Sequence, residues 1–378
     1  MALEIQRRDS ISVDEFVRDF LEPNLPVVLG PKLTEHWAAR KEWVAGATGE
    51  KPNFARLKEL YGQSAVQVAQ CDQVYFSDQK RVEMQFGDFI DQWRDHGSDN
   101  KLYCKDWHFA RANPEYQAYT PLAHVSDDWI DLYHGHQDDD YRFCYMGGDG
   151  TWTPFHEDVF RSYSWSANIC GEKRWTLVPP GQSELFTDAR GNWIYNLDDY
   201  DRAQFPRAHE LQKVQFVQRR GETVFVPSGW WHQVTNIGDT ISINHNWANE
   251  FNLRFLYARL RSDMGAVRHA LRDVADMAGF EDHAQLVLRA DSGTDFRSFF
   301  AFVQFMTAVY LRQITGRPDA AELQAFDPHF RSAASIRCAL QRIADVLDAM
   351  AADQTAQALG GLGDSIVQLR QRIAAAGA

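Results

Sequence analysis

The sequence predicts an α+β protein in which a β-rich core precedes a helical C-terminal domain. Two stretches, SYSWSANI from Ser162 and TISINHNW from Thr240, alternate small polar residues with bulky apolar ones. Side chains two residues apart point to the same face of a strand, so each stretch is expected to form a strand with one polar face. From 249 to 378 the apolar residues recur at helical spacing instead. We therefore expect a first domain over 1–250 and an α-helical domain over 251–378.

The N-terminal part is expected to add helices and strands to this core. Residues 10–21 (SISVDEFVRDFL) place apolar residues at helical spacing behind a serine, which predicts a capped helix. The patterns that follow predict a turn into a short strand over 24–30, a helix in two pieces over 34–62, a strand over 65–69, a helix over 84–93 and a strand over 141–146. Lys105 and Asp106 are expected to form a structural ion pair, and Gly147–Gly150 a tight turn.

The triplet His156-Glu157-Asp158 is the first candidate site. In an extended segment its histidine and aspartate share one face, so both can reach one metal ion. Taken alone, such a triplet is more often a pair of solvated loop residues.

The segment that follows gives the triplet more weight. The polar stripe from Ser162 to Asn168, which includes Ser166, either faces water or lines a pocket beside the metal. Gly171-Glu172 predicts a turn into a second strand that starts at Lys173. That lysine is either solvated or placed to pair with the carboxylate of an acid.

A third ligand must come from elsewhere, because two side chains fill only part of a coordination sphere. Residues 221–226 predict a strand and 227–229 a turn, and His232 follows two tryptophans. His232 is either a core histidine bonded to a backbone carbonyl or a ligand, since a buried imidazole is costly without a partner. Asn236–Asp239 predicts a hairpin turn before the last strand.

A rival metal site has to be weighed at His134-Gly135-His136, which precedes Asp138, Asp139 and Asp140. Histidines beside carboxylates suit zinc or calcium. However, no strand or turn signal fixes these side chains, so a solvated acidic loop is the expectation.

Residues 181–220 form a long insertion between the two halves of the candidate site, with aromatic and acidic residues along it. Insertions of this size are often functional. This one is expected either to form part of a substrate groove or to pack as a surface excursion.

Composition narrows the function classes. The 378 residues carry a formal net charge of −13 and no basic run, which argues against direct nucleic-acid binding. Five cysteines without a C-x-x-C pair fit a reducing compartment and exclude a cysteine zinc ribbon. No apolar stretch reaches the length of a membrane span, and no signal sequence opens the chain. We expect a cytoplasmic protein without membrane contact, with the nucleus as the alternative location.

Four separated motifs together resemble the Jumonji-C (JmjC) family of iron- and 2-oxoglutarate-dependent oxygenases. They are TPFHEDVF, SWSANICGEKRW, GETVFVPSGWWHQV and INHNW, in this order, and the resemblance covers roughly 20–250. It implies a double-stranded β-helix, the jelly-roll core of the cupins, with N-terminal helices and strands. It also implies that His156, Asp158 and His232 bind Fe(II), which leaves coordination positions for 2-oxoglutarate and dioxygen.

The same resemblance assigns residues to the cosubstrate. Lys173 and Thr153 match positions that hold the distal carboxylate of 2-oxoglutarate, where an ammonium gives a charge-assisted bond. Tyr145 matches a cosubstrate-contacting tyrosine. Asn246 and Asn244 match polar positions that flank the metal and cosubstrate, and Ser166 lies near a position where some relatives have an asparagine.

Within the family, the motifs are most similar to hydroxylases that modify a lysine of a translation release factor. The implied activity is hydroxylation of a protein side chain, with succinate and carbon dioxide as co-products. N-methyl-lysine demethylation is one alternative, although many demethylases have H-x-E where this chain has H-x-D. A catalytically silent cupin that acts as a binding module is the other, and it predicts a broken triad or a missing lysine. The expected partner is a protein or peptide substrate, and relatives imply a homodimer through the C-terminal helices.

Overall fold

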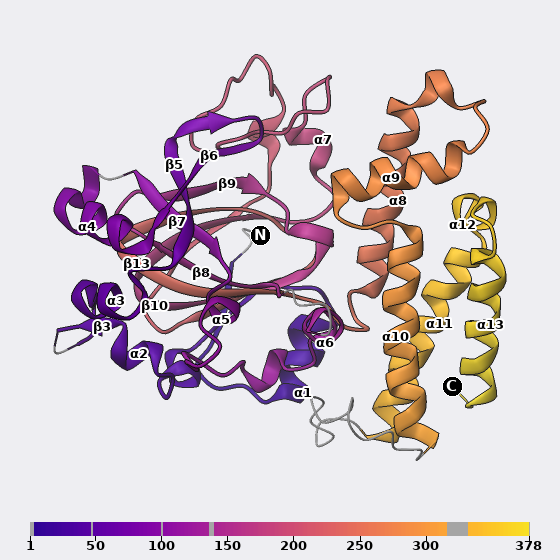
Figure 1. The fold of residues 1–378 in the computed structure, drawn as a ribbon, viewed down its shortest axis with the longest axis horizontal. Coiled ribbons are helices and arrows are strands. Elements are labelled where there is room, and N and C mark those ends of the chain that lie inside the picture. Colours follow the sequence, from indigo (N-terminus) through magenta and orange to yellow (C-terminus); the bar gives the residue numbers. More distant parts are fainter. Residues whose placement is uncertain (1–3, 47, 100, 136–139, 316–331, 378) are drawn as a thin grey trace. The chain divides into compact units, whose positions relative to one another are not determined.

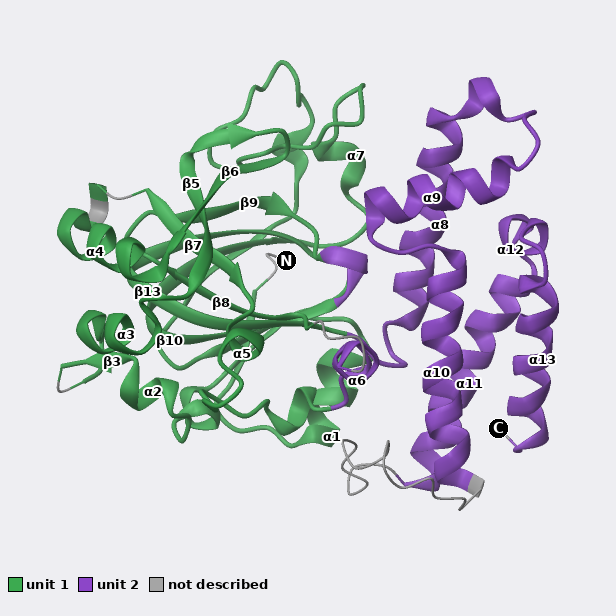
Figure 2. Cartoon of the chain, in the orientation of Figure 1, with its two compact units in different colours: residues 1–126, 139–158, 163–247 green, residues 127–138, 159–162, 248–378 purple. Residues whose placement is uncertain are grey.

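The computed structural model describes residues 4–46, 48–99, 101–135, 140–315 and 332–377 (Figure 1). The chain divides into two compact units (Figure 2). Unit 1 takes 1–126, 139–158 and 163–247, and unit 2 takes 127–138, 159–162 and 248–378. Two short segments of the predicted first domain thus cluster with the C-terminal helices. The predicted division into domains 1–250 and 251–378 stays a prediction.

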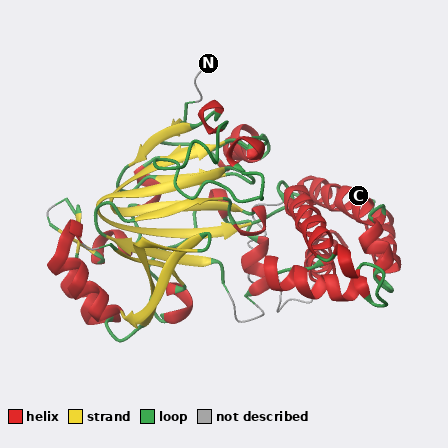
Figure 3. Cartoon of the chain, turned by 90° about the horizontal axis from the view of Figure 1, so that it is seen from above, coloured by secondary structure: helices red, strands yellow, loops and turns green. Residues whose placement is uncertain are grey.

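Among the described residues, eleven strands of unit 1 form one sheet, in the order β1-β2-β12-β10-β13-β8-β7-β5-β6, with β11 beside β10 and β9 beside β13. The strands are β1 Gln6–Arg8, β2 Val27–Leu29, β5 Ala65–Tyr75, β6 Asp78–Gln85, β7 Leu102–Trp107, β8 Arg142–Gly147, β9 Trp152–His156, β10 Tyr163–Val178, β11 Val214–Gln218, β12 Thr223–Val226 and β13 Trp231–Trp247. Only the β1–β2 pair among these is parallel. The strands curve strongly (Figure 3), and the predicted α+β fold with a jelly-roll core is confirmed.

Two long strands, β10 and β13, carry the sheet through both halves of the site. They pair from Tyr163↔Trp247 to Val178↔Trp231, with register shifts between Asn168 and Glu172. The turns predicted at 171–172 and 236–239 are therefore wrong. The turn-prone residues form bulges instead, because ladder hydrogen bonds on either side outweigh the local turn preference. Each bulge bends its strand without ending it.

The N-terminal elements agree with the sequence in part. Ser12 caps α1 (Val13–Phe16) through a capping box with Glu15, and a π-helical turn continues the helix over Val17–Leu21. The predicted strand over 24–30 is confirmed by β2. The helical region expected over 34–62 holds α2 (Ala39–Glu42) and α3 (Phe54–Tyr61), separated by the short strands β3 (Val44–Ala45) and β4 (Lys51–Pro52).

The β5–β6 hairpin is longer than predicted, and the ion pairs near it differ from the predicted one. Strand β6 occupies the start of the helix predicted at 84, so α4 begins later, at Phe86–His96. The predicted Lys105–Asp106 pair is wrong: Lys105 pairs with Asp78, and Asp106 pairs with Arg81. Asp106 has a φ of 57°, which turns its side chain out of the regular alternation of β7.

An apolar core packs against the second half of β10 and the first half of β13. Trp175 and Val234, one from each long strand, belong to a buried cluster with Val28, Val226 and Trp230. A second cluster places Phe155 of β9 against Val178 and the insertion helix α7 (Ser183–Phe186). The strands that supply the candidate site are thus fixed in place by packed apolar side chains.

Unit 2 is helical, as predicted for the C-terminal part. Its helices are α6 Trp129–His134, α8 Leu253–Ala270, α9 Phe280–Ser292, α10 Phe296–Thr315, α11 Ala333–Ala351, α12 Gln354–Ala358 and α13 Leu362–Ala375. The sequence predicts breaks between helices at Gly293 and Gly361, and in the structure Gly293 follows α9 and Gly361 precedes α13, both in the left-handed conformation. The sequence also predicts a break at Arg317-Pro318-Asp319, which lies outside the described residues. In the part of the chain that the structure describes, no helix has the length and apolar character needed to cross a membrane.

Candidate metal centre and adjoining pocket

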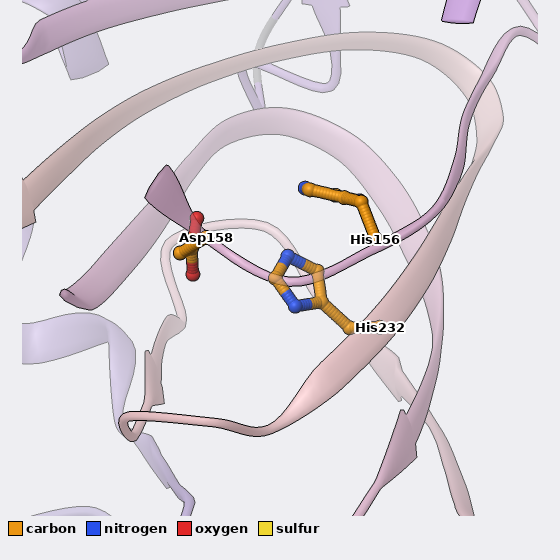
Figure 4. A group of neighbouring side chains, drawn as sticks. All are labelled: His156, Asp158 and His232. Carbon is orange, nitrogen blue, oxygen red and sulfur yellow. The ribbon is translucent and has the colours of Figure 1, made fainter. Parts of the chain in front are cut away.

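Three side chains predicted as ligands converge at one point of unit 1 (Figure 4). His156 ends β9, Asp158 lies two residues later, and His232 is the second residue of β13. One ligand atom from each lies within 4.8 Å of the other two. The structure thus brings together groups that are far apart in the sequence.

Antiparallel pairing of β9 with β13 sets the two histidines side by side. His156 and His232 are direct partners in this ladder, and a bulge follows between His232 and Val234. Directly opposed residues of an antiparallel pair have their side chains on the same face, only about 5 Å apart at Cβ. The ring centroids are accordingly 4.2 Å apart.

Both imidazoles are oriented by backbone carbonyls. Nδ1 of His156 lies 2.8 Å from the carbonyl oxygen of Pro154, and Nδ1 of His232 lies 3.1 Å from that of Trp230. Each ring therefore carries its proton on Nδ1 and donates it there, which leaves Nε2 as a free lone pair. Burial, reinforced by the neighbouring His232, lowers the pKa of His156 to about 4. A neutral imidazole is the form that ligates a metal.

Asp158 is held from two sides. The hydroxyl of Ser164 donates to one carboxylate oxygen over 2.8 Å, and the amide of Asn246 donates to the other over 2.9 Å. Ser164 and Asn246 are themselves register partners on β10 and β13. The carboxylate is thus oriented by the two long strands, although it follows β9 in the chain.

Lys173 lies buried on the second half of β10, with only 2% of its surface exposed. Its ammonium group contacts the Tyr103 hydroxyl at 3.3 Å and lies 5.5 Å from the centre of the Tyr145 ring. Burial lowers the pKa of Lys173 to about 7. A buried cation without a carboxylate partner is costly, so this position favours an anionic ligand.

A pocket joins the metal centre to this lysine. All nine residues singled out in the sequence line it: Tyr145, Thr153, His156, Asp158, Ser166, Lys173, His232, Asn244 and Asn246. Five lining residues were not singled out: Tyr103, Ser164, Trp165, Trp175 and Val234. Ser164 was detectable as part of the polar stripe. Tyr103 was not, because only the fold brings its hydroxyl on β7 to the ammonium group of Lys173 on β10.

Like Asn246 and Lys173, the predicted cosubstrate residues Tyr145, Ser166 and Asn244 use polar side-chain atoms in hydrogen bonds to protein partners. The Tyr145 hydroxyl donates to Asp106, which lies outside the pocket lining. Ser166 donates to the side-chain oxygen of Asn244 over 3.0 Å. Burial and the Asp106 charge raise the pKa of Tyr145, so its hydroxyl stays protonated.

The rival metal site is not assembled within the described residues. His134 ends α6, and 136–139 lie outside the described residues. Asp140 pairs with His108 at 2.5 Å. Among the described side chains, His156, Asp158 and His232 form the one group of three that could hold a metal ion.

The residues present fit a divalent transition metal. Two imidazoles with free Nε2 atoms and one fixed carboxylate supply three ligands, which leaves other positions of an octahedral ion open. This set of two histidines and one carboxylate is typical of non-haem Fe(II) oxygenases. A structural zinc site would instead be closed by four protein ligands.

Comparison with known proteins first defines the class. A model of the cupin-like domain family matches residues 13–253. The 2-oxoglutarate and iron-dependent oxygenase JMJD4 of Gallus gallus is 41% identical over 312 residues, which cover 79% of this chain and 73% of its relative. The human protein of that name is 38% identical over 337 residues, covering 84% and 80%.

A plant relative bears a different name. The arginine-specific demethylase JMJ20 of Arabidopsis thaliana is 42% identical over 314 residues, covering 78% of this chain and 67% of its relative. The chain belongs to the cupin-like domain family and, within it, to the family of the JMJD4 2-oxoglutarate and iron-dependent oxygenases.

Proposed function

We propose that this chain is a 2-oxoglutarate- and Fe(II)-dependent oxygenase that hydroxylates a protein side chain, with lysine as the target residue. One observation carries the proposal: three ligand atoms within 4.8 Å of one another open into the same pocket as a buried, unneutralised lysine. A site that binds only a metal ion does not need that ammonium group. A site that also binds a dicarboxylic acid needs a cation to pair with the carboxylate that lies away from the metal.

His156, Asp158 and His232 would hold the iron. Their roles follow from their hydrogen bonds: Pro154 and Trp230 fix the imidazole rings, while Ser164 and Asn246 fix the carboxylate. Because these partners are in place before a metal arrives, the ligands need little rearrangement to bind one. Bound Fe(II) and 2-oxoglutarate would supply the chemistry that activates dioxygen. A carbon–hydrogen bond of the substrate would be hydroxylated, with succinate and carbon dioxide as co-products.

Lys173 would pair with the distal carboxylate of 2-oxoglutarate. The binding of that anion neutralises a buried charge, so it favours the protonated lysine that burial alone disfavours. Thr153 is the other residue proposed to hold this carboxylate, and it lines the same pocket. Tyr145 contributes its ring beside the ammonium, since its hydroxyl is turned to Asp106.

The asparagines and Ser166 would shape the pocket wall. Asn246 acts through Asp158, to which it donates, and is therefore proposed as a positioning residue. Asn244 and Ser166 form a bonded pair across β10 and β13. Trp165 and Trp175 supply apolar surface to a wall that is otherwise mostly polar.

The substrate proposal rests on the motif resemblance to hydroxylases of a translation release factor, and a lysine of such a factor is the first candidate. N-methyl demethylation is the second candidate function. It is favoured by the name of the arginine-specific demethylase JMJ20, which is 42% identical to this chain. Both reactions hydroxylate a carbon atom. Demethylation hydroxylates the methyl carbon bound to nitrogen, and the first candidate reaction hydroxylates a carbon of the side chain itself. They differ in whether formaldehyde is released.

The test is product analysis with purified protein, Fe(II), 2-oxoglutarate and peptides that carry lysine, methyl-lysine or methyl-arginine. Hydroxylation predicts peptide-dependent succinate and a gain of one oxygen atom on unmodified lysine, without formaldehyde. Formaldehyde from a methylated peptide, with no oxygen gain on lysine, would replace the first candidate by the second. The complete triad and Lys173 argue against a silent binding module, which predicts no succinate with any peptide.

A further inference from the structure

The β5–β6 hairpin ends in three consecutive exposed apolar residues. Val74 is 64% exposed, Tyr75 62% and Phe76 86%. Tyr75 pairs with Asp78, so the hairpin closes through a two-residue loop, Phe76-Ser77. The aromatic rings of Tyr75 and Phe76 pack edge-on, 4.7 Å apart, and both remain open to solvent. We call Val74, Tyr75 and Phe76 the hairpin tip.

The backbone at this tip is strained, in addition to the exposure of its apolar side chains. Phe76 has a φ of 52°, at the first position of the two-residue loop. Type II′ hairpins take glycine there, because a side chain is strained at positive φ. A bulky aromatic residue therefore adds strain and exposes apolar surface at the same position. Neither feature helps folding, and strained, exposed residues of this kind gather at functional sites.

Two hydrogen bonds fix the hairpin to the strand that leads into the metal centre. The Trp152 indole donates to the carbonyl oxygen of Cys71 over 3.1 Å, and the Gln79 amide donates to the carbonyl oxygen of Trp152 over 3.0 Å. Cys71 and Gln79 flank the hairpin tip in the chain. Trp152 immediately precedes Thr153, which lines the pocket. The two strands that carry the tip are therefore bonded to the strand that supplies a pocket residue.

An ion-pair network makes a second connection. Asp78 pairs with the buried Lys105 at 2.9 Å, and Arg81 pairs with Asp106 at 2.6 Å. Asp106 in turn accepts a hydrogen bond from the pocket-lining Tyr145. A segment docked on the tip would thus be positioned relative to the reacting atoms by rigid contacts within unit 1.

The chemistry of the tip favours a positively charged polypeptide. The open faces of Tyr75 and Phe76 can hold lysine or arginine side chains through cation–π contacts. Asp72 and Lys80 are both exposed on the same hairpin and offset each other, while the whole chain carries a formal net charge of −13. Basic segments are attracted to a chain of this net charge, and acidic ones are repelled.

We propose that the hairpin tip is the docking surface for a basic segment of the polypeptide substrate, next to the residue that is hydroxylated. This rests on the proposed function, which supplies the reason for a polypeptide to approach this pocket. The tip acts in binding alone and touches no metal ligand. Its loss should leave iron and 2-oxoglutarate binding unchanged.

The test uses the full chain loaded with Fe(II) and 2-oxoglutarate under anaerobic conditions. The probes are two fluorescein-labelled 12-residue peptides with a central lysine, flanked by arginines in one and by glutamates in the other. The double variant Y75S/F76G removes both rings and places glycine at the strained position. Leu60→Ser is the matched control, because Leu60 is 37% exposed on α3 and away from the hairpin in the chain.

The wild type and the Leu60→Ser variant should bind the arginine-flanked peptide with equal affinity, and the double variant at least tenfold more weakly. The glutamate-flanked peptide should bind to none of them. The double variant should melt at the same temperature as the wild type or higher, and should develop the same iron–2-oxoglutarate absorption band. Loss of that band in the wild type would count against the proposed function alone.

Four results would overturn the docking proposal: equal peptide affinity of the double variant and wild type, no discrimination between the peptides, a clear drop in melting temperature, or a wild-type dimer that the double variant dissociates. A drop in melting temperature would make the tip a structural element. Dissociation of a dimer would make it a contact between copies of this chain.

Discussion

His156 and His232 face each other as direct partners of β9 and β13, with ring centroids 4.2 Å apart and each Nδ1 turned to a backbone carbonyl oxygen. The register of one strand pair thus decides which two nitrogens are left for a metal. A slip of one residue would move His232 to the other face of the sheet. The approach of these two histidines is therefore a consequence of sheet pairing.

The hydrogen bonds to Asp158 should matter for metal affinity. Ser164→Ala and Asn246→Ala each free one carboxylate oxygen, and loss of such supporting bonds weakens metal binding about 10- to 100-fold. Anaerobic titration with Fe(II) measures the affinity. Ser183→Ala, on α7, is the control and should bind as the wild type does. Unchanged affinity in both site variants would mean that Asp158 needs no support.

Lys173 should lower the free energy of unfolding of the protein. In the folded state burial lowers its pKa from 10.5 to about 7, while the unfolded chain keeps the ordinary value. Between these two values the unfolded state binds more protons, so the free energy of unfolding rises with pH across that window. Lys173→Met should remove this pH dependence and raise the melting temperature at pH 7, while 2-oxoglutarate binding is lost.

Denaturant melts between pH 7 and 9, together with calorimetric titration of 2-oxoglutarate, check this pair of effects. Lys80→Met is the control, since Lys80 is exposed on β6 and should change neither quantity. A Lys173→Met protein that is less stable and still binds 2-oxoglutarate would show that this lysine has a purely structural role.

Tyr145 offers a finer test of the cosubstrate assignments. Its hydroxyl donates to Asp106 while its ring lies beside the Lys173 ammonium. Tyr145→Phe should therefore change the dissociation constant for 2-oxoglutarate little, because the hydrogen bond that it removes joins Asp106 and not the cosubstrate. Tyr145→Ala removes the ring and should weaken binding more. Equal losses in the two variants would place the hydroxyl on the cosubstrate.

The bulge in β10 should be sensitive to a single methyl group. Gly171 has a φ of 68°, and a Cβ there would lie 2.4 Å from the Asp239 carbonyl oxygen. Gly171→Ala should cost about 3 kcal/mol through strain and overlap. Gly181→Ala is the matched control: its φ is 87°, with nothing within 4 Å of the added atom. It should cost about 1 kcal/mol. Equal costs, measured by denaturant unfolding, would contradict the bulge geometry.

His156, Asp158 and His232 were singled out as ligands through the motif resemblance, and the fold brings their side chains together. Their role as metal ligands stays a prediction, whereas parts of the predicted path of the chain were wrong. The turns expected at 171–172 and 236–239 were wrong because glycine and asparagine mark bulges as well as turns, and only long-range pairing distinguishes them. That pairing is invisible in either segment alone.

The charges around the β5–β6 hairpin show the same limit. Lys105 and Asp106 are adjacent in the sequence, which predicts a local pair. The positive φ of Asp106 and the unexpected strand β6 send each to a separate partner, Asp78 and Arg81. Strand β6 itself was missed because its sequence, DQKRVEMQ, is dominated by polar residues on an exposed edge.

The central claim is that one ion binds between β9 and β13 with 2-oxoglutarate beside it. Its most direct measurement is anaerobic titration with Fe(II) and 2-oxoglutarate, monitored by the visible metal-to-ligand charge-transfer band. The wild type should develop this band, and His156→Ala and His232→Ala should not. A His232→Ala protein that binds iron normally and develops the full band would contradict the account.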